Sequence, residues 1–449
     1  MIRGLASRSA PESGYRSGVA ADQSSSPDEV FAGAVLRGLS QGWLPGLAWL
    51  DGGELGRSFV ASEPDLVIEG DDMAQLDDVD ARWRRDPSRV WIGWMTYELG
   101  VDRMLTRPPG RGPRPGLCMR RYAGVVERDP DGTERTHGDP EASGRLQSAL
   151  RRAASAPLRP LPWPVEELQP RLEPEEYRQR VSRAREAIAA GETYQVNLSQ
   201  SFGARWRATA PPGTPVRVAS TYANLRRRWP ASMGAVLEAD RDTWFLSNSP
   251  ETLLDVRREG DGADQMQARS WPLKGTRPRH ADPEQDEAAR AELWASEKDR
   301  AEHLMIVDLV RNDLGRIAVP GSVQAPGEPS LLALPTVHHL VTEVRASLPA
   351  DTSLRSMVEA MFPGGSITGA PKRRTVEIID ELEEHARGIY CGAIVLLEPT
   401  GLRMSIPIRT AVVDRYGLNL CAGGGVVIDS DPEAERLETI VKTRAFSGQ

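Results

Sequence analysis

The last predicted helix carries two carboxylates and an ammonium on one face. Glu435, Glu438 and Lys442 are separated by offsets of three and four residues, which stack side chains along an α-helix. A solvated ion pair is the common meaning of this spacing. Two carboxylates can also hold Mg2+, which takes few protein ligands and fills its other positions with water and substrate oxygens. The ammonium beside them would then bind an anionic substrate.

Three glycines precede this helix and follow a predicted strand, in the sequence AGGG at 422–425. Small residues in succession expose their backbone N–H groups, which can form a concave nest for an anion. A plain turn explains the same residues. We therefore predict an anion-binding nest at Gly423, Gly424 and Gly425, with a turn as the alternative.

Lysine is rare in this chain, which makes each lysine informative. Only four of the 56 basic residues are lysines, at positions 274, 298, 372 and 442. Lysine differs from arginine because its compact ammonium can lose a proton and act as a nucleophile. Lys274 lies in the semi-apolar strand-to-turn segment PLKGTRPR at 272–279, a setting that can lower the pKa of a lysine. The sequence indicates a candidate nucleophile there.

Other acidic residues lie in two segments, SNSPETLL at 247–254 and SEKDRAEH at 296–303. Glu251 follows a proline and is a candidate general acid if it is buried. The second segment brings Glu297, Asp299, Glu302 and His303 together. A charged helix face is its ordinary explanation, and Glu302 gains a role only if it meets Glu438 across a cleft.

One glycine-rich segment, FPGGSITGAPK at 362–372, superficially resembles a phosphate loop. After Gly369 the phosphate-loop pattern requires Lys and then Ser or Thr, but Ala370 and Pro371 stand there instead. A nucleotide-binding site at this segment is therefore disfavoured.

The elements that must position these residues are mixed helices and strands. We predict a helix over 173–191, because its first turn is acidic, Pro174 stands at an early position and Gly191 ends it. A long helical stretch is predicted over about 282–316, and a final helix over 432–446. WIGWMTYELG at 91–100 predicts a buried strand that enters a turn. Further strands are predicted at 194–204, 233–238, 243–247, 388–398, 403–414 and 418–428.

The composition is typical of a soluble globular protein, with 39% hydrophobic and 27% charged residues among 449. No apolar run approaches the roughly 18 residues that a membrane span needs, and no signal peptide is recognisable. A net charge of -8 disfavours nucleic acid and anionic membranes as partners. Three widely spaced cysteines, at 118, 391 and 421, show neither disulfide nor metal spacing, so we expect a cytoplasmic location.

We expect four regions along an α+β chain. Residues 1–28 form a tail rich in Ser, Ala, Gly and Arg, and 29–155 form an N-terminal subdomain. The Pro-rich segment 156–172 is the best candidate for a linker, and 173–446 form the catalytic domain.

Nine segments resemble the chorismate-utilising enzymes, a family that includes anthranilate synthase, aminodeoxychorismate synthase, isochorismate synthase and salicylate synthase. They follow the family's order over about 190–446. The resemblance implies stacked antiparallel β-sheets flanked by helices, as in anthranilate synthase component I, with a chorismate-binding site between them. The matching segments are TYQVNLSQ, SNSPETLL, PLKGTRPR, SEKDRAEHLMIVDLVRNDLGRI, TVHHLVTEV, FPGGSITGAPKRRTVEIIDELE, RGIYCGAI, IPIRTAVV and AGGGVVIDSDPEAERLETIVK.

The resemblance also implies roles for single residues. Lys274 would be the nucleophile, Glu251 the acid that helps the C4 hydroxyl leave, and His339 the family's active-site histidine. Glu302 and Glu438 would be the principal Mg2+ ligands, with Glu435 and Asp299 nearby, and the metal would hold the ring carboxylate of chorismate. The implied substrate-binding residues are Gly275, Thr276, Tyr390, Arg409, Gly423, Gly424, Gly425 and Lys442.

Two positions distinguish members of the family. The isochorismate and salicylate synthases have a water-activating lysine where this chain has Gln195, and anthranilate synthases typically have alanine where it has Lys274. Because aminodeoxychorismate synthases also have a lysine there, the resemblance implies synthesis of 4-amino-4-deoxychorismate, for the para-aminobenzoate and folate pathway. Lys274 would attack C2 of Mg2+-bound chorismate and Glu251 would help expel the C4 hydroxyl. Ammonia would then add at C4 and release the lysine.

Ammonia must come from outside this sequence, because it contains no Gly-x-Cys-x-Gly nucleophile turn of a glutaminase. We expect a heterodimer with a glutamine amidotransferase subunit, or direct use of free ammonia in vitro. Within the family, the alternatives are an anthranilate synthase in which Lys274 is incidental and a synthase of 2-amino-2-deoxyisochorismate. A non-catalytic scaffold is a third alternative, disfavoured because the chemically competent residues are intact.

Overall fold

The computed structural model describes residues 26–106, 109–110, 112, 115–154, 163–258, 265–334 and 337–447. The predicted tail lies outside the described residues up to residue 25, as does the predicted linker up to residue 162. Pro27 and Asp28, the end of the predicted tail, already belong to helix α2 (Pro27–Ser40), which Ser26 caps. Near the end of the predicted linker, Gln169–Pro170 forms strand β8.

The largest sheet has eleven antiparallel strands. The glycine-rich strand β22 lies close to one edge of this sheet, between β9 and β21. Strand β8 also pairs with β9, beside the main order. From one edge to the other, the order is β18 (Gly369–Ala370), β9 (Gln195–Arg205), β22 (Gly417–Val426), β21 (Thr410–Val413), β11 (Thr243–Ser249), β10 (Met233–Asp240), β1 (Ala48–Asp51), β2 (Ser58–Ala61), β6 (Gly124–Arg128) and β7 (Glu134–Gly138).

A second antiparallel sheet has eight strands, and a third has three. The order in the second sheet is β17 (Val344–Pro349), β13 (Gln265–Ser270), β12 (Thr252–Arg258), β20 (Gly401–Ser405), β19 (Ala393–Glu398), β4 (Val90–Met95), β5 (Leu117–Tyr122) and β3 (Pro64–Gly70). The order in the third is β14 (Leu273–Pro278), β16 (Val337–Val341) and β15 (Ser330–Ala333).

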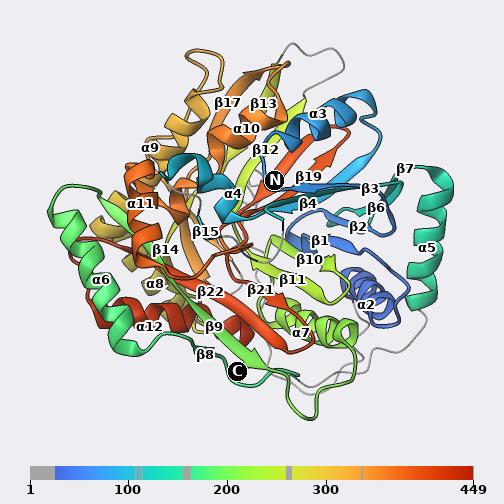
Figure 1. Ribbon diagram of the computed structural model, residues 1–449, viewed down its shortest axis with the longest axis horizontal. Coiled ribbons are helices and arrows are strands. Elements are labelled where there is room, and N and C mark those ends of the chain that lie inside the picture. Colours follow the sequence, from blue (N-terminus) through green and yellow to red (C-terminus); the bar gives the residue numbers. More distant parts are fainter. Residues whose placement is uncertain are drawn as a thin grey trace.

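The helices flank the three sheets, and α8 packs on the third (Figure 1). The α-helices besides α2 are α3 (Gln75–Arg85), α4 (Tyr97–Val101), α5 (Pro140–Ala154), α6 (Pro174–Ala189), α7 (Thr214–Arg228), α8 (Pro283–Ala295), α9 (Glu297–Gly315), α10 (Leu354–Met361), α11 (Lys372–Leu382) and α12 (Pro432–Lys442). Short 3-10 turns are η1 (Gly53–Leu55), η2 (Asp102–Met104), η3 (Gly365–Ile367) and η4 (Arg444–Phe446).

Alternation of side chains along the strands divides the core into layers. One buried cluster joins inward-facing residues of β1, β2, β10 and β11 to those of β4, β5 and β19, so the two large sheets pack face to face. Trp94 and Phe245 meet edge to face across this layer, with ring centroids 5.2 Å apart. The outer face of the first sheet packs on α2, α5 and α7, and that of the second on α3, α9 and α10. The predicted fold of stacked antiparallel sheets with flanking helices is confirmed.

Both large sheets are built from strands of the two halves of the chain. In the first, β1 pairs with β10, and in the second, β4 pairs with β19. Residues of the predicted N-terminal and catalytic regions therefore share hydrogen-bonded sheets and a core. No helix in the described part of the chain is long and apolar enough to cross a bilayer.

Three predicted elements differ from those in the structure. The stretch 282–316 is two helices, because Ser296 accepts a hydrogen bond from the Asp299 N–H and caps α9. The predicted strand at 403–414 is two strands, β20 and β21, which belong to different large sheets. The predicted strand at 388–398 begins only at Ala393, after a turn in which Cys391 has a φ of 60°. The helix predicted over 173–191 is confirmed as α6.

Candidate active site

The third sheet presents Lys274 beside a position that only glycine can occupy. Strand β14 pairs with β16, and the register shifts between Lys274 and Thr276. Gly275 between them has a φ of 64°, and a Cβ there would lie 2.6 Å from Leu293 Cδ1. A side chain would therefore strain the backbone and collide with α8. Such irregularities redirect neighbouring side chains, and here the neighbour is Lys274.

Lys274 is half-buried. Within the described ranges, no residue makes a hydrogen bond or an ion pair with its ammonium. Burial lowers the pKa of Lys274, and so does the charge of Lys442, whereas three carboxylates act in the opposite direction, those of Glu302, Glu251 and Glu438. Burial without a close partner favours the neutral amine, which is the nucleophilic form.

Glu251 is a buried carboxyl group in the connection between β11 and β12, with 6% of its surface exposed. The Ser366 hydroxyl donates to its Oε1 at 2.7 Å. Burial raises the pKa of Glu251 to about 7, and the Ser366 hydrogen bond and the charge of Lys274 oppose this only in part. A carboxyl group with this pKa retains a proton near neutral pH, which a general acid requires.

His339 on β16 is a buried, neutral imidazole. Its Nδ1 lies 2.8 Å from the Gly275 carbonyl oxygen and 3.2 Å from the Thr276 hydroxyl. Because a carbonyl can only accept, Nδ1 holds the proton and Nε2 carries the lone pair. Nε2 is buried and has no hydrogen-bond partner in the part of the chain that the structure describes. Burial lowers the pKa of His339 to about 4, so this nitrogen is available as an acceptor.

Arg409 lies where the chain passes from β20 to β21, with a φ of 49°. It is half-buried, and no carboxylate among the described residues forms an ion pair with it. Burial lowers its pKa, yet a guanidinium stays charged in a protein. Such a cation can receive a carboxylate through two parallel hydrogen bonds. Tyr390, also predicted to bind substrate, is 5% exposed and lies in the turn that precedes β19.

The prediction of an anion-binding nest at Gly423–Gly425 is wrong, because these residues form part of a strand. Gly423, Gly424 and Gly425 lie inside strand β22 and pair with β9, so their backbone is extended and does not form a nest. Glycine is needed there for close approach. A Cβ on Gly424 would lie 2.8 Å from Glu435 Oε2, and one on Gly425 would lie 2.6 Å from Gln195 Nε2.

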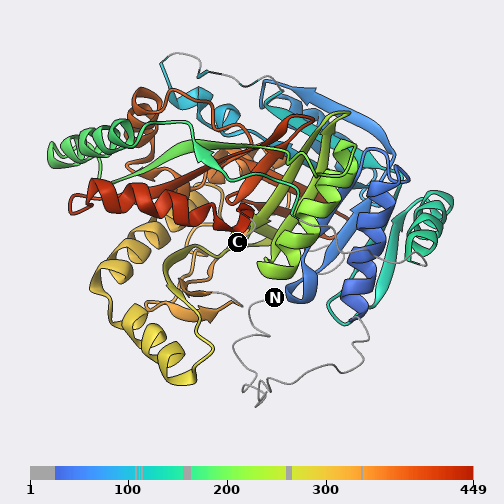
Figure 2. The same ribbon diagram turned by 90° about the horizontal axis from the view of Figure 1, so that it is seen from below.

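The three carboxylates predicted to hold Mg2+ come from two helices, which Figure 2 shows in yellow-gold (α9) and red (α12). Glu302 projects from α9, while Glu435 and Glu438 project from α12. Burial raises the pKa of Glu302 and of Glu435, and the charge of Glu438 adds to both increases. These groups therefore lie within one another's electrostatic field.

The present partners of these carboxylates are protein groups. Ser430 Oγ donates to Glu435 at 2.6 Å, and Lys442 Nζ lies 2.7 Å from Glu438 and 2.8 Å from the Gly423 carbonyl oxygen. Across the described ranges, no group of three or more His, Cys, Asp or Glu side chains is assembled closely enough to hold a metal. The donor set nevertheless fits Mg2+, because it offers hard anionic oxygens whose mutual repulsion a divalent cation would relieve.

Asp299, predicted to lie near the metal, is engaged elsewhere. Its Oδ2 lies 3.1 Å from Arg277 Nη2. The remaining lysines are also paired. Lys372 Nζ lies 2.6 Å from Asp313 Oδ2, and the exposed Lys298 lies 4.0 Å from Glu302.

Sequence reasoning missed one residue of this region, Ser366, and understated two others, His303 and Gln195. Ser366, which bonds to Glu251, lies in the segment that we considered only as a phosphate loop. His303 is 2% exposed, its Nε2 lies 2.7 Å from the Thr342 hydroxyl, and burial together with the charge of Lys274 lowers its pKa to about 4. Gln195 is fully buried, and both of its amide atoms lack a partner among the described residues.

The family model for chorismate binding enzymes matches residues 54–448. Aminodeoxychorismate synthase component 1 of Klebsiella aerogenes is 44% identical over 276 residues, which are 61% of this chain and 58% of the relative. Anthranilate synthase component 1 of Streptomyces coelicolor is 40% identical over 272 residues, 60% of this chain and 50% of the relative. These matches span less than two thirds of either relative.

A solved structure shares the fold. Anthranilate synthase component I from Streptococcus pneumoniae TIGR4 has a TM-score of 0.71 and 26% identity, and the match covers 87% of this chain and 92% of that one. The family match extends over most of the chain and includes every residue of the candidate site. This protein therefore belongs to the chorismate binding enzyme family.

Proposed function

We propose that this chain aminates chorismate at C4 to give 4-amino-4-deoxychorismate. The observation that carries the proposal is Lys274, a half-buried lysine without a hydrogen-bond or ion-pair partner in the described structure, within the electrostatic reach of Glu251, whose pKa is about 7. This arrangement supports a nucleophile and an acid acting in one site. Similarity to aminodeoxychorismate synthase component 1 of Klebsiella aerogenes supports the same activity.

In the first step, the neutral amine of Lys274 attacks C2 of chorismate and forms a C–N bond. Both ring double bonds shift, from C1=C2 to C1=C6 and from C5=C6 to C4=C5, the C4–O bond breaks, and Glu251 gives its proton to the departing hydroxyl, which leaves as water. In the second step, ammonia attacks C4 and the C2–N bond breaks. The electron pair returns to the lysine, and the ionised Glu251 takes up the proton that ammonia loses. Two displacements of moderate barrier replace one difficult displacement.

Several side chains fit the task of holding the substrate's two carboxylates. Arg409 offers a guanidinium fork that no carboxylate in the described ranges pairs with, and Lys442 offers an ammonium beside strand β22. Tyr390 and the backbone of Gly423–Gly425 would complete the contacts, together with Gly275 and Thr276 beside the nucleophile. The free Nε2 of His339 would accept a hydrogen bond from the substrate.

Mg2+ would be held by Glu302, Glu435 and Glu438. When bound, it would neutralise the substrate's ring carboxylate and orient the ring. Lys442, which lies 2.7 Å from Glu438, would bind the substrate with its ammonium.

Ammonia would come from a glutamine amidotransferase subunit that pairs with this chain. The designation "component 1" of the Klebsiella relative supports a second component. Gln195 supports ammonia over water as the incoming group, because an amide cannot serve as a base to activate water.

Anthranilate synthesis is the second candidate, favoured by the 40% identity to the Streptomyces coelicolor enzyme. Analysis of the products separates the two. Purified protein is incubated with chorismate, MgCl2 and ammonium chloride, and the products are identified by chromatography and mass spectrometry. The proposal predicts aminodeoxychorismate, which added lyase converts to para-aminobenzoate, whereas anthranilate with pyruvate would refute it.

A further inference from the structure

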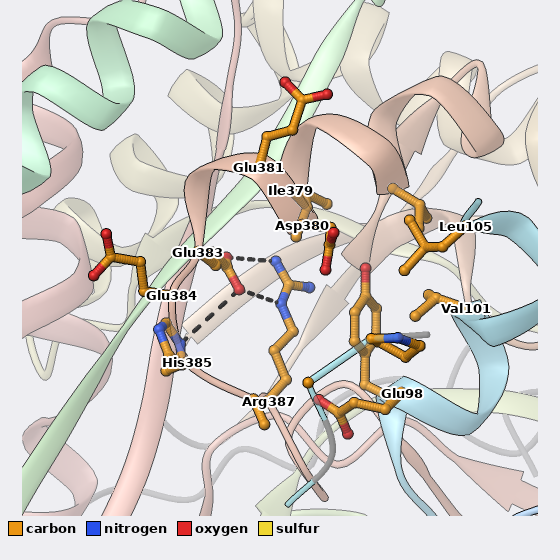
Figure 3. Close-up of a pocket in the computed structure, with 15 residues that line it drawn as sticks. Glu98, Val101, Leu105, Ile379, Asp380, Glu381, Glu383, Glu384, His385 and Arg387 are labelled. Carbon is orange, nitrogen blue, oxygen red and sulfur yellow. Dashed lines mark hydrogen bonds and ion pairs between the residues drawn. The ribbon is translucent and has the colours of Figure 1, made fainter. Parts of the chain in front are cut away.

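A buried ion pair lies beside strand β9, the neighbour of the glycine-rich strand β22. Its two residues are not among those assigned to bind substrate or metal. Arg387 and Glu383 have side chains that are only 1% and 3% exposed. They meet through two parallel bonds, from Arg387 Nη2 to Glu383 Oε1 at 2.7 Å and from Nε to Oε2 at 2.8 Å. Figure 3 shows this pair at the side of a cavity of about 470 Å³, next to His385 and across from Glu98.

The remaining hydrogen bonds of the pair are made to two other segments, strand β9 and the turn η3. Arg387 donates to the Asn197 carbonyl at 2.7 Å and to the Ile367 carbonyl at 3.1 Å. Glu383 Oε1 accepts from the Ser199 N–H at 2.6 Å and from the Ser199 hydroxyl at 2.9 Å. One guanidinium and one carboxylate thus tie strand β9, the turn η3 and the end of α11 to one another.

Strand β9 and the turn η3 both contact the candidate site. On β9, Ser199 pairs with Gly423 and Asn197 pairs with Gly425 in the register of β22. On η3, Ile367 directly follows Ser366, whose hydroxyl bonds to Glu251 at 2.7 Å. The pair therefore supports both the glycine strand and the serine that holds the general acid.

Stability alone is a weak reason for such a pair. Removing two charges from water costs more than their attraction commonly returns, so apolar residues of similar size often fill such a place equally well. What an apolar pair cannot supply is the planar fork that fixes the Ile367 and Asn197 carbonyls at once. Arg387 also lies 4.5 Å from the Tyr97 ring centroid and 5.9 Å from that of Tyr390.

We infer that Glu383 and Arg387 are positioning residues for amination, which set Ser366, and through it Glu251, relative to the glycine strand. The inference rests on the proposed function. It adds two residues that touch neither substrate nor metal.

The test is Arg387→Lys in the full chain, measured with chorismate, MgCl2 and ammonium chloride. The lysine keeps the charge beside Glu383 but cannot bond both carbonyls. We expect kcat to fall by roughly ten-fold or more, since small displacements of catalytic groups are costly. The basic limb of the pH profile should also move to higher pH, because the Ser366 hydrogen bond that lowers the pKa of Glu251 is weakened.

The matched control is Arg128→Lys, in the Arg128–Asp28 pair whose side chains are 5% and 13% exposed. That pair joins α2 to β6, toward the opposite edge of the first sheet from β9. Thermal melting of both variants measures the purely structural effect. An unchanged kcat and an unmoved basic limb in Arg387→Lys would overturn the inference, as would equal losses in the control.

If Arg387→Lys does not fold, the apolar pair Glu383→Leu/Arg387→Met is measured against the same two criteria. Wild-type protein run beside the variants separates the two levels of the argument. Absence of aminodeoxychorismate from the wild type would refute the proposed function. A wild-type product with a normal kcat and pH profile in the variants would refute only the positioning role.

Discussion

Two lysines with similar surroundings differ in one respect. Lys274 on β14 and Lys372 at the start of α11 are both half-buried, and burial lowers the pKa of each. Lys372 lies 2.6 Å from Asp313 and donates to the Pro363 carbonyl at 3.0 Å, so its ammonium is fixed. Among the described residues, no group holds the ammonium of Lys274 in this way. Burial disfavours the charged form of both lysines, but for Lys372 the close carboxylate of Asp313 opposes this effect and holds the ammonium in place.

The largest effect should follow removal of the free lysine. We expect Lys274→Ala to reduce turnover of chorismate by roughly 10⁴-fold or more, as loss of a nucleophile typically does. Lys274→Arg should be equally inactive, because arginine cannot become neutral at working pH. Steady-state kinetics with ammonium chloride measures both variants. Turnover near the wild-type rate in Lys274→Ala would show that Lys274 is not the nucleophile.

The next effect concerns the acid that acts with Lys274. Glu251→Gln should lower kcat by about 10²- to 10⁴-fold, the usual contribution of a general acid. In the wild type, Glu251 loses its proton as the pH rises through about 7, so kcat should decline above this pH. The variant should lack this limb in a kcat–pH profile. If the decline in kcat near pH 7 persisted unchanged in Glu251→Gln, it would belong to the titration of another group.

For the paired lysine, the expected effect is on stability. Lys372→Met leaves Asp313, whose side chain is 7% exposed, with only the half-exposed Arg316 at 3.5 Å as an ion-pair partner among the described residues. We expect the free energy of unfolding in urea to drop by about 3–5 kcal/mol, the usual consequence of breaking a buried pair. The control Asp313→Leu/Lys372→Met should recover most of the loss. If the single variant were as stable as wild type but inactive, Lys372 would belong with Lys274.

The smallest effect should come from the exposed lysine. The side chain of Lys298 is 64% exposed and lies 4.0 Å from Glu302. We expect Lys298→Ala to change the free energy of unfolding by less than about 1 kcal/mol, because solvent screens such pairs. Urea denaturation and turnover assays check this. A large loss of turnover would extend the functional role to a third lysine.

Local signals predicted the elements that depend on local chemistry. Helix α6 follows from Pro174 and an acidic first turn, and the structure places it at Pro174–Ala189. The break at Ser296 was missed although the cap signal, Ser296 followed by Asp299, was present in the sequence. The crossing between sheets at Arg409 could not be predicted, because it depends on which distant strands pair.

The candidate site shows the same division. Residue types and family resemblance named Lys274, Glu251 and Arg409, whereas the relation between Glu251 and Ser366 joins positions 115 residues apart. Nothing local marks that pair. The nest at Gly423–Gly425 was predicted wrongly because glycine permits both a nest and a close-packed strand, and only the pairing with β9 decides between them.

The most direct test of Lys274 as a nucleophile is intact-protein mass spectrometry after incubation with chorismate and MgCl2 in the absence of ammonia. The account predicts a covalent adduct with the mass of chorismate less one water, mapped by peptide analysis to Lys274 and discharged when ammonium chloride is added. Wild-type protein that makes aminodeoxychorismate but forms no adduct, or forms one at another residue, would contradict it.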